Sequence, residues 1–313
     1  FGPGVHNLPN DTLFVPSGTT VYIDGGARVY GNIFTEGAHD VNIFGRGEVH
    51  PDGRGAGVWV RRSKNVRIDG IVVSQLPIGQ CDSVELTNVK SISYYGWGDG
   101  MDVFSSSNVI LDGVFCRNSD DCTAVYASIQ GFKGGSNNVL VKNATLWADV
   151  AHPINIGGHG DPNGMDTVQN VTFRNIDILD QAEKQIDYQG CLAINPGDNT
   201  LVRNITFENI RIEDFRNGQL VNFRISFNPK YCVSTGRGIH NVLVKDVTNG
   251  SGENLSIIAG YDENHKISGI RFVNLVVNGR KITDDMPGKP KWYKTGDMAG
   301  IFIGEHVENI SFE

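Results

Sequence analysis

A short strand-like motif recurs along almost the whole of this chain of 313 residues. Each copy reads Asn-Val-x-apolar and closes on Asn, Asp or Gly, and clear copies begin at Asn65, Asn108, Asn138 and Asn170. Alternation of apolar and polar residues is typical of β-strands, and no stretch keeps a helical apolar period. The spacing between copies varies, for example 25 residues from Val41 to Val66 and 40 residues from Ile270 to Ile310. A strand unit repeated at such spacings indicates a solenoid. The sequence therefore predicts an all-β fold, a right-handed parallel β-helix with connections of variable length.

The repeat also predicts which side chains face inward. Aligning the apolar positions gives an interior column, and the residues just before them give an outward column, because successive strand residues point to opposite faces. The predicted interior column is Val103, Val125, Ile156, Ile194 and Ile225, and the outward column is Asp102, Ala124, Asn155, Ala193 and Arg224. We interpret the outward column as a candidate floor for a bound substrate.

The repeats leave little room for a second domain. Residues 1–16 are rich in Pro, Gly and Asn and are expected to form an extended N-terminal cap, followed by a β-helix over 17–313. The first strand-like segment is expected at 19–29, and residues 284–294 are expected to form a surface loop. The chain opens on Phe1 and stops inside a repeat, so we expect a trimmed N-terminus and a further C-terminal coil.

Composition narrows the possible partners. The net charge of −8 disfavours nucleic acid as a partner, and no apolar run is long enough to span a membrane. The five cysteines form no Cys-x-x-Cys pair, which disfavours a zinc site, and their odd number gives no clear disulfide framework. No metal or other cofactor is expected, and the sequence does not predict an oligomeric state.

Three carboxylates are brought together by the repeat. When Val103 is aligned with Val125, Asp99 falls on Asp121, and Asp120 precedes it. Adjacent parallel strands lie about 4.8 Å apart, so the three carboxylates would lie close together. At that range they cannot all ionise freely, and at least one pKa should rise. Aspartates in β-helices often cap strands, but three in register favour a general acid–base site over that alternative.

These residues carry a family resemblance. The segments Gly98-Asp99-Gly100-Met101-Asp102-Val103 and Asn118-Ser119-Asp120-Asp121-Cys122 resemble the paired catalytic motifs of glycoside hydrolase families 28 (pectinases) and 49 (dextranase and isopullulanase). The segments 144–157 and 277–282 resemble the dextranase branch more closely. The resemblance implies an inverting hydrolase in which Asp120 is the general acid and Asp99 and Asp121 activate water. Asp102 remains an alternative base, because strand parity points it outward.

The sequence also departs from the pectinase pattern. Polygalacturonases carry Asn-Thr-Asp where this chain has Trp97-Gly98-Asp99, and Arg-Ile-Lys where it has Arg224-Ile225-Ser226. The missing lysine would have paired with a galacturonate carboxylate, so its absence favours a neutral poly- or oligosaccharide, such as an α-glucan. The basic segment 289–294 would supply charge instead if it folded over the site. Substrates of this class imply a secreted or periplasmic protein.

Further candidates for substrate binding surround the aspartates. His152 aligns above Asp121, while His159 lies in a pectinase-like Gly-His-Gly; an ordinary turn histidine is the alternative for each. Arg224 is a candidate for binding sugar hydroxyls or for a surface salt bridge. Candidate sugar-stacking residues are Trp97, Tyr126 and Trp147, although Trp147 could simply cover the end of the core.

Two other functions compete with hydrolysis. A polysaccharide lyase of the same fold would hold Ca²⁺ with the aspartates, since carboxylate oxygens suit that ion, and would use Arg224 as its base. A non-catalytic glycan-binding β-helix would explain the repeats but not the clustered aspartates.

Overall fold

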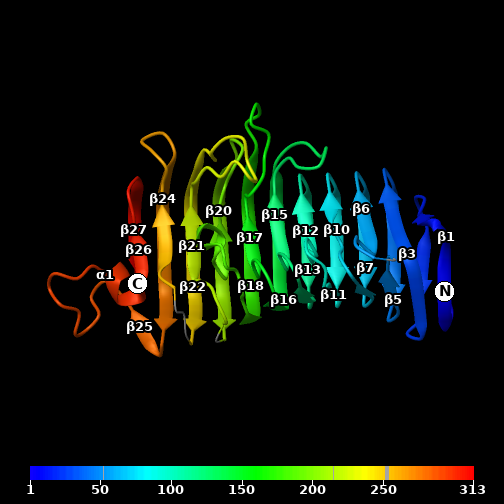
Figure 1. The fold of residues 1–313 in the computed structure, drawn as a ribbon, viewed down its shortest axis with the longest axis horizontal. Coiled ribbons are helices and arrows are strands. Elements are labelled where there is room, and N and C mark those ends of the chain that lie inside the picture. The colour runs from blue at the N-terminus through cyan, green and yellow to red at the C-terminus, as the bar shows by residue number, and fades with distance from the viewer. Residues whose placement is uncertain (52, 214, 251–253) are drawn as a thin grey trace.

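The computed structural model describes residues 1–51, 53–213, 215–250 and 254–313 and confirms the parallel β-helix (Figure 1). The strands stack side by side along one long axis, with the two termini at opposite ends. Hydrogen bonds join each coil to the next in three parallel ladders, A, B and C.

Ladder A carries the residues predicted to form the site. Its strands are, in order of stacking, β1 (Gly4–Phe14), β3 (Ala27–Glu36), β6 (Val58–Arg61), β9 (Ile78–Gly79), β12 (Met101–Phe104), β15 (Thr123–Tyr126), β17 (Ile154–Ile156), β19 (Leu192–Ile194), β21 (Val221–Arg224), β23 (Ser256–Ala259) and β26 (Ile301–Ile303).

Ladders B and C complete each coil. Ladder B contains β2 (Thr20–Ile23), β4 (His39–Gly45), β7 (Lys64–Asp69), β10 (Asp82–Thr87), β13 (Ser107–Asp112), β16 (Ser136–Ala148), β18 (Thr167–Asp180), β20 (Leu201–Ile212), β22 (Gly238–Asn249), β24 (Lys266–Val277) and β27 (Val307–Phe312). Ladder C runs from the first halves of β1 and β3 through β5 (Glu48–His50), β8 (Val72–Val73), β11 (Lys90–Ile92) and β14 (Phe115–Asn118) into the second half of β16. From β16 onward, the long strands turn the corner from ladder B to ladder C without a break.

Asparagine explains why the repeat has its sequence. At the corner between ladders B and C, residues such as Asn143, Asn175 and Asn209 adopt positive φ angles of 54–57°. Asparagine tolerates this left-handed conformation better than most residues. The side-chain amides also bond along the stack: Asn143 donates to Asp112, Asn175 to Asn143 and Asn209 to Asn175. The repeat is thus a corner signal as well as a strand signal.

The two ends of the chain add detail to the predicted boundaries. Residues 4–14 already form β1, which pairs in parallel with β3, so the first strand begins well before the segment expected at 19–29. At the other end, an Asn278-Gly279 turn leads into β25 (Arg280–Ile282), which pairs antiparallel with β24. The basic segment 289–294 projects at this end of the stack, beside the short helix α1 (Thr295–Ala299), far from the middle of ladder A (Figure 1).

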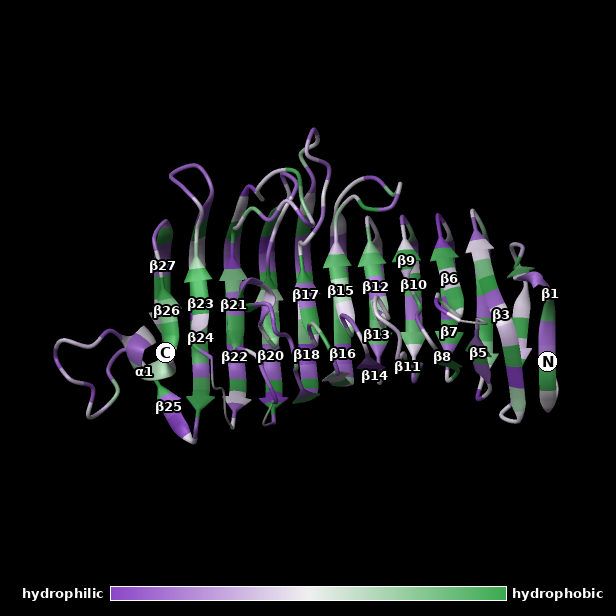
Figure 2. Ribbon diagram, in the orientation of Figure 1, coloured by the Kyte–Doolittle hydropathy of each residue, from purple (hydrophilic) through white to green (hydrophobic). Residues whose placement is uncertain are grey.

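Burial distinguishes ladder A from the rest of the surface. Strand ribbons alternate between hydrophobic and hydrophilic bands (Figure 2), and the outward positions of ladder B strands such as β4 and β7 are exposed. In β12, β15, β17 and β19 every residue is buried, so the outer face there is covered. Long connections, including 127–135 and 225–237, leave ladder A at this part of the chain.

Two expectations from composition can be compared with the fold. All five cysteines are free and buried, so none forms a disulfide. Among the described residues, no helix is long and apolar enough to cross a membrane.

Candidate active site

Asp99 lies in the turn that enters β12. Met101 pairs with Thr123 and Val103 with Val125, so Asp99 lies beside Asp121, as the repeat predicts. The glycines that flank Asp99 are required by close packing. A Cβ atom on Gly98 would lie 2.4 Å from the Ser119 hydroxyl oxygen, and one on Gly100 would lie 2.2 Å from the Cys122 carbonyl oxygen. The motif therefore seats Asp99 against the turn that carries Asp120 and Asp121.

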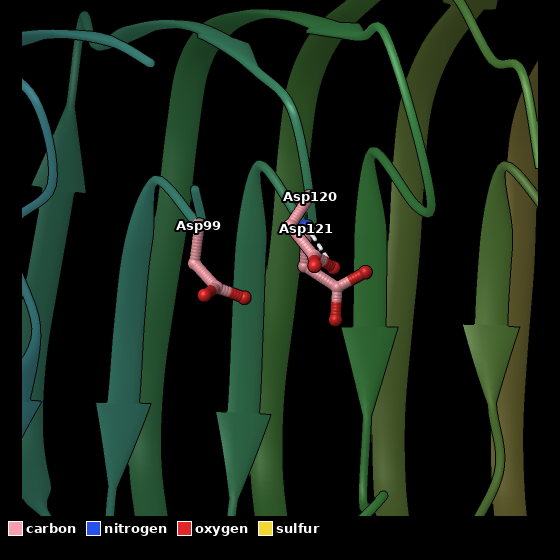
Figure 3. A group of neighbouring side chains, drawn as sticks. All are labelled: Asp99, Asp120 and Asp121. Atoms are coloured by element: carbon pink, nitrogen blue, oxygen red, sulfur yellow. Dashed lines mark hydrogen bonds between the residues drawn. The ribbon is translucent and has the colours of Figure 1, made fainter. Parts of the chain in front are cut away.

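The three aspartates form one cluster. One carboxylate oxygen from each of Asp99, Asp120 and Asp121 lies within 4.8 Å of the other two. Figure 3 shows the side chains at the starts of neighbouring strands, with the Asp121 amide donating to Asp120 Oδ1 over 3.1 Å. Asp99 and Asp120 are partly exposed, whereas Asp121 is buried. A bound substrate can therefore reach the first two.

Hydrogen bonds fill both oxygens of Asp121. Its Oδ1 accepts from His152 Nδ1 at 2.7 Å and from the His152 backbone amide at 3.1 Å. Its Oδ2 accepts from the Tyr126 hydroxyl at 2.7 Å and from Asn155 Nδ2 at 2.8 Å. Four donors to one carboxylate strongly favour its ionised form.

The environment drives the pKa values of the two neighbouring aspartates apart. Burial and the charge of Asp121 raise the pKa of Asp120 to about 6. Burial alone would raise the pKa of Asp121 as well, but the His152 charge and the hydrogen bonds from His152, Asn155 and Tyr126 outweigh it and lower that pKa. Burial, with Asp120 and Asp121, raises the pKa of Asp99 well above its ordinary value. A proton donor thus lies directly beside a permanent carboxylate, which is the arrangement acid–base catalysis uses.

The two candidate histidines have different positions. His152 is buried and bonded to Asp121, and although burial alone would lower its pKa, Asp121 raises it. It therefore acts on Asp121 as a charged partner. His159 packs edge-on against the Tyr126 ring, with ring centroids 5.1 Å apart, and burial lowers its pKa. His159 reaches the carboxylates through Tyr126, while His152 bonds to one directly.

Tyr126 and Asn155 support the site from below. The Tyr126 ring is buried, stacks on Phe104 at a centroid distance of 5.8 Å and uses its hydroxyl on Asp121. This geometry supports a positioning role instead of a sugar-stacking one. Asn155 Nδ2 also donates to the Tyr126 hydroxyl over 2.9 Å, so the two side chains brace each other.

The two candidate tryptophans differ in exposure. Trp97 is 76% exposed two residues before Asp99, and Arg54 lies 5.4 Å from its ring centroid. It is available as a sugar platform. Trp147 lies near the C-terminal end of β16 and is only partly exposed. The Arg117 guanidinium carbon lies over its ring, 4.2 Å from the ring centroid. This favours a structural role for Trp147.

The predicted outward column is wrong at its last member, Arg224. Asp102, Ala124, Asn155 and Ala193 align as predicted, but the next member is Asn222, not Arg224, and the interior residue beside it is Phe223, not Ile225. Arg224 lies two residues further along and its guanidinium pairs with Asp187 at 2.5 Å. Of the two alternatives for the predicted arginine, the structure shows the salt bridge.

Asp102 occupies the predicted outward position but lies beneath the cluster. It is buried, and its Oδ1 has no hydrogen-bond partner among the described residues. Burial and then Asp99 raise its pKa well above the ordinary value. Asp99 is partly exposed and Asp102 is not, so the structure favours Asp99 as the carboxylate that meets water.

Sequence reasoning missed two supports of the site. Asn118 donates from Nδ2 to the hydroxyls of Ser91 and Ser93 and to the Asp99 carbonyl, which ties the turn of Asp99 to the next coil. Glu183 is a buried carboxylate whose charge contributes to raising the pKa values of both Asp120 and His152. The Asn118-Ser119 dipeptide stood within the recognised motif, but nothing local marked Glu183.

The aspartate cluster also fits a cation only in part. Three carboxylate oxygens at this range could contact a hard cation, and Ca²⁺ takes six to eight oxygen ligands. However, four hydrogen bonds already occupy Asp121, and the charge of His152 lies against it. The residues present therefore fit a resident Ca²⁺ poorly.

Comparison with known proteins finds a family of glycoside hydrolases that matches most of the chain. The family model of glycosyl hydrolases family 28 matches residues 48–290. The chain is 24% identical over 246 residues to an exopolygalacturonase of Cochliobolus carbonum, covering 67% of this chain and 52% of that protein. It is 27% identical over 218 residues to a polygalacturonase of Juniperus ashei, covering 66% and 39%. The chain thus spans about half the length, or less, of these relatives.

Solved structures agree on the fold. The family 28 exopolygalacturonase of Yersinia enterocolitica superposes with a TM-score of 0.70 at 13% identity, covering 98% of this chain and 71% of that one. Dex49A of Penicillium minioluteum superposes with a TM-score of 0.56 at 14% identity, covering 99% and 62%. The match over most of its length shows that the chain belongs to glycosyl hydrolase family 28. A closer relation to the dextranase branch is not confirmed, since the sequence relatives are polygalacturonases.

Proposed function

We propose that this chain hydrolyses glycosidic bonds in a poly- or oligosaccharide. The observation that carries the proposal is the cluster of three carboxylates, with oxygens within 4.8 Å of one another, in which the pKa of Asp120 is raised to about 6 and that of its neighbour Asp121 is lowered. Glycoside hydrolysis needs one protonated and one ionised carboxyl group at the same bond. Family membership supports the same reaction class.

The roles follow from exposure and charge. Asp120 is partly exposed and protonated at mildly acidic pH, so it can give its proton to the leaving glycosidic oxygen as the bond to the anomeric carbon breaks. Water forms the new bond to that carbon and passes a proton to the Asp99–Asp121 pair. Asp99 is the partly exposed member of this pair, and four hydrogen bonds already occupy Asp121, so Asp99 is the member that meets the water.

We expect inversion at the anomeric carbon. Asp121 is the ionised carboxylate, and four hydrogen bonds occupy its oxygens, so water and not Asp121 should attack. Proton NMR of the first-formed product anomer measures this directly. The nearest oxygens lie within 4.8 Å, shorter than the roughly 6.5–9.5 Å usual for inverting enzymes. Retention would therefore identify Asp99 as a nucleophile and overturn the water mechanism.

The side chains near the cluster support a neutral sugar as substrate. Ser226 carries no charge where a lysine would pair with a uronate, and Arg224 is paired with Asp187. The basic segment 289–294 lies at the C-terminal end of the stack and does not cover the site. An exposed cation does lie nearby: Tyr231 first, and then Glu183 and Asp120, contribute to raising the pKa of Lys230. Lys230 is therefore the residue to test in any uronate recognition.

A glycan panel tests the substrate class. We expect reducing ends to be released faster from neutral α-glucans, including dextran, than from polygalacturonate. The variant Lys230→Ala should leave hydrolysis of the neutral glycans unchanged. If polygalacturonate is the fastest substrate and Lys230→Ala removes that preference, the neutral-sugar proposal fails and Lys230 supplies the missing charge.

The alternative function is that of a polysaccharide lyase, because the carboxylate oxygens of the aspartate cluster could contact Ca²⁺. We expect turnover to persist after treatment with a chelator, since Asp121 already has all its hydrogen bonds and a cationic neighbour. Product analysis in the same assay separates the reactions. Loss of activity in chelator, recovery with Ca²⁺ and unsaturated products would together assign the protein to the lyases.

A further inference from the structure

Two connections meet over ladder A on the C-terminal side of the aspartate cluster. One is 181–191, which enters β19 and contains the short 3₁₀ helix η1 (Ile186–Tyr188), and the other is 225–237, which leaves β21. They come from opposite edges of ladder A, because one precedes a strand of this ladder and the other follows one. We call the place where they meet the bridge.

Side chains join the two halves of the bridge at three contacts. The Tyr231 hydroxyl donates to Gln185 Oε1 over 3.2 Å, and the rings of Tyr188 and Tyr231 pack edge-on with centroids 5.0 Å apart. Asp187 reaches Arg224, the last residue of β21, and pairs with its guanidinium at 2.5 Å. The connection that enters ladder A is thus tied to the edge where the strands end.

The bridge covers the outward column just past the site. Asn155 is followed in register by Ala193 and then Asn222, and both of these are 0% exposed. The Asn222 Nδ2 lies 3.5 Å from the Ile186 carbonyl oxygen, so the connection 181–191 crosses directly above it. The predicted substrate floor therefore ends beneath the bridge.

Both halves of the bridge lie close to the acid. Burial and Asp121 raise the pKa of Asp120, and the charge of Glu183 in 181–191 adds to this. Tyr231 first, and then Glu183 and Asp120, raise the pKa of Lys230 in 225–237. Strand β19 is two strand steps from β15, or about 10 Å. This length of ladder has room for one or two sugar residues between the carboxylates and the bridge.

Ladder A is open in the other direction. The turns that leave β3, β6, β9 and β12 contain only two residues each, at 37–38, 62–63, 80–81 and 105–106, and are too short to reach across the ladder. Figure 1 shows these short turns and the longer connections from β15 onward. The connection 127–135 folds back along the edge, where Arg62 donates to the Gly131 carbonyl oxygen over 3.4 Å. A glycan chain can therefore continue from the carboxylates toward the N-terminal coils.

From this asymmetry we infer that the protein cleaves its glycan from one chain end and holds the terminal one or two residues between the carboxylates and the bridge. The inference rests on the proposed glycoside hydrolysis and adds its mode of action. Tyr188, Tyr231 and Arg224 determine this specificity, because an internal segment of a glycan would have to continue through the bridge that they close.

Binding of capped oligosaccharides tests the bridge without turnover. The protein is the Asp120→Asn variant, and the probe is an oligosaccharide of the glycan that the panel shows to be cleaved fastest. It is compared with two derivatives that carry a bulky fluorophore at the reducing or at the non-reducing end. We expect one cap to weaken binding about tenfold and the other to leave it unchanged.

Product analysis of the active protein tests the same point. The first products should be mono- or disaccharides, with little loss of viscosity for each reducing end released. If both caps are tolerated, or if the first products are long, the bridge does not close the site and the inference fails while the hydrolysis stands. If no glycan of the panel is cleaved, the proposed hydrolysis fails, and the inference fails with it.

A double variant locates the effect. Combining Tyr231→Ala with Arg224→Ala removes all three contacts of the bridge. It should restore binding of the capped probe when placed in the Asp120→Asn protein, and in the active protein it should increase the loss of viscosity for each reducing end. The matched control is Tyr261→Ala, because Tyr261 is 49% exposed and packs on His265 of its own connection. A double variant that melts like wild type and still rejects the capped probe would overturn the role of the bridge.

Discussion

The Asp120→Asn variant is expected to lose about 10²–10⁴-fold in kcat, the usual contribution of a general acid. The amide has nearly the same shape as the acid, and its oxygen can still accept the hydrogen bond from the Asp121 amide. It has no proton to give to the leaving oxygen. Initial rates on the best glycan of the panel measure the loss. Turnover within twofold of wild type would remove Asp120 from the role of acid.

Stability and pH dependence provide the controls for this variant. Because the pKa of Asp120 is raised to about 6, ionising Asp120 above that pH destabilises the fold, and the neutral amide avoids this penalty. The melting temperature of Asp120→Asn at pH 7 should therefore equal or exceed that of wild type. In wild type, kcat/KM should fall as pH rises through about 6, because the acid of the free enzyme loses its proton. A profile flat from pH 5 to 8 would contradict this assignment.

The Asp121→Asn variant should lose both activity and stability. It leaves the buried His152 without its counter-ion, and breaking one side of a buried pair typically costs about 3–5 kcal/mol. The loss should be accompanied by lower kcat, since the water loses its ionised neighbour. Melting curves of Asp121→Asn beside Asp120→Asn separate the two effects, because only the first removes a buried partner.

The pH dependence of this loss follows from the two pKa shifts. The lowered pKa of Asp121 gives stability that is present above the unfolded value of about 4 and is lost as pH falls through the folded pKa. The raised pKa of His152 gives stability that is fully present below about 6.5 and is lost as pH rises through the folded pKa. The difference in melting temperature between wild type and Asp121→Asn should therefore be largest near pH 5 and shrink in alkali. A difference that stays constant into alkali would show that His152 is neutral.

The repeat could predict the core of the site because one apolar column fixes the register. Val103, Val125 and Ile156 align as expected, and this alone places Asp99 and His152 beside Asp121. The same reasoning slipped by two residues at β21. Phe223 and Ile225 are both buried, so a shift of two keeps every side chain on its face and the pattern cannot choose between them.

Other parts of the site depend on contacts that no local pattern records. The sequence predicts Tyr126 as a sugar-stacking residue, but its ring packs in a buried cluster with Phe132, which comes from the following connection. Glu183 reaches the acid from a connection two coils beyond Asp121, where neither motif nor strand alternation applies. The spacing of the repeat predicts that some connections are long. It cannot predict their paths, because these depend on packing between coils.

The molecule should tolerate inserted residues in the connections that leave ladder A, but not at the corner between ladders B and C. There each amide is a link in a chain of side-chain bonds from Asp112 through Asn143 and Asn175 to Asn209, so an inserted residue would break the links above and below it. Connections such as 127–135 and 225–237 leave ladder A with no such ladder, and lengthening them costs only the slowly growing entropy of a longer loop. Lengthening a connection at exposed positions such as Gln130 and Gly131, with the buried Phe132 kept, should therefore change which glycans are accepted while the melting temperature stays nearly constant.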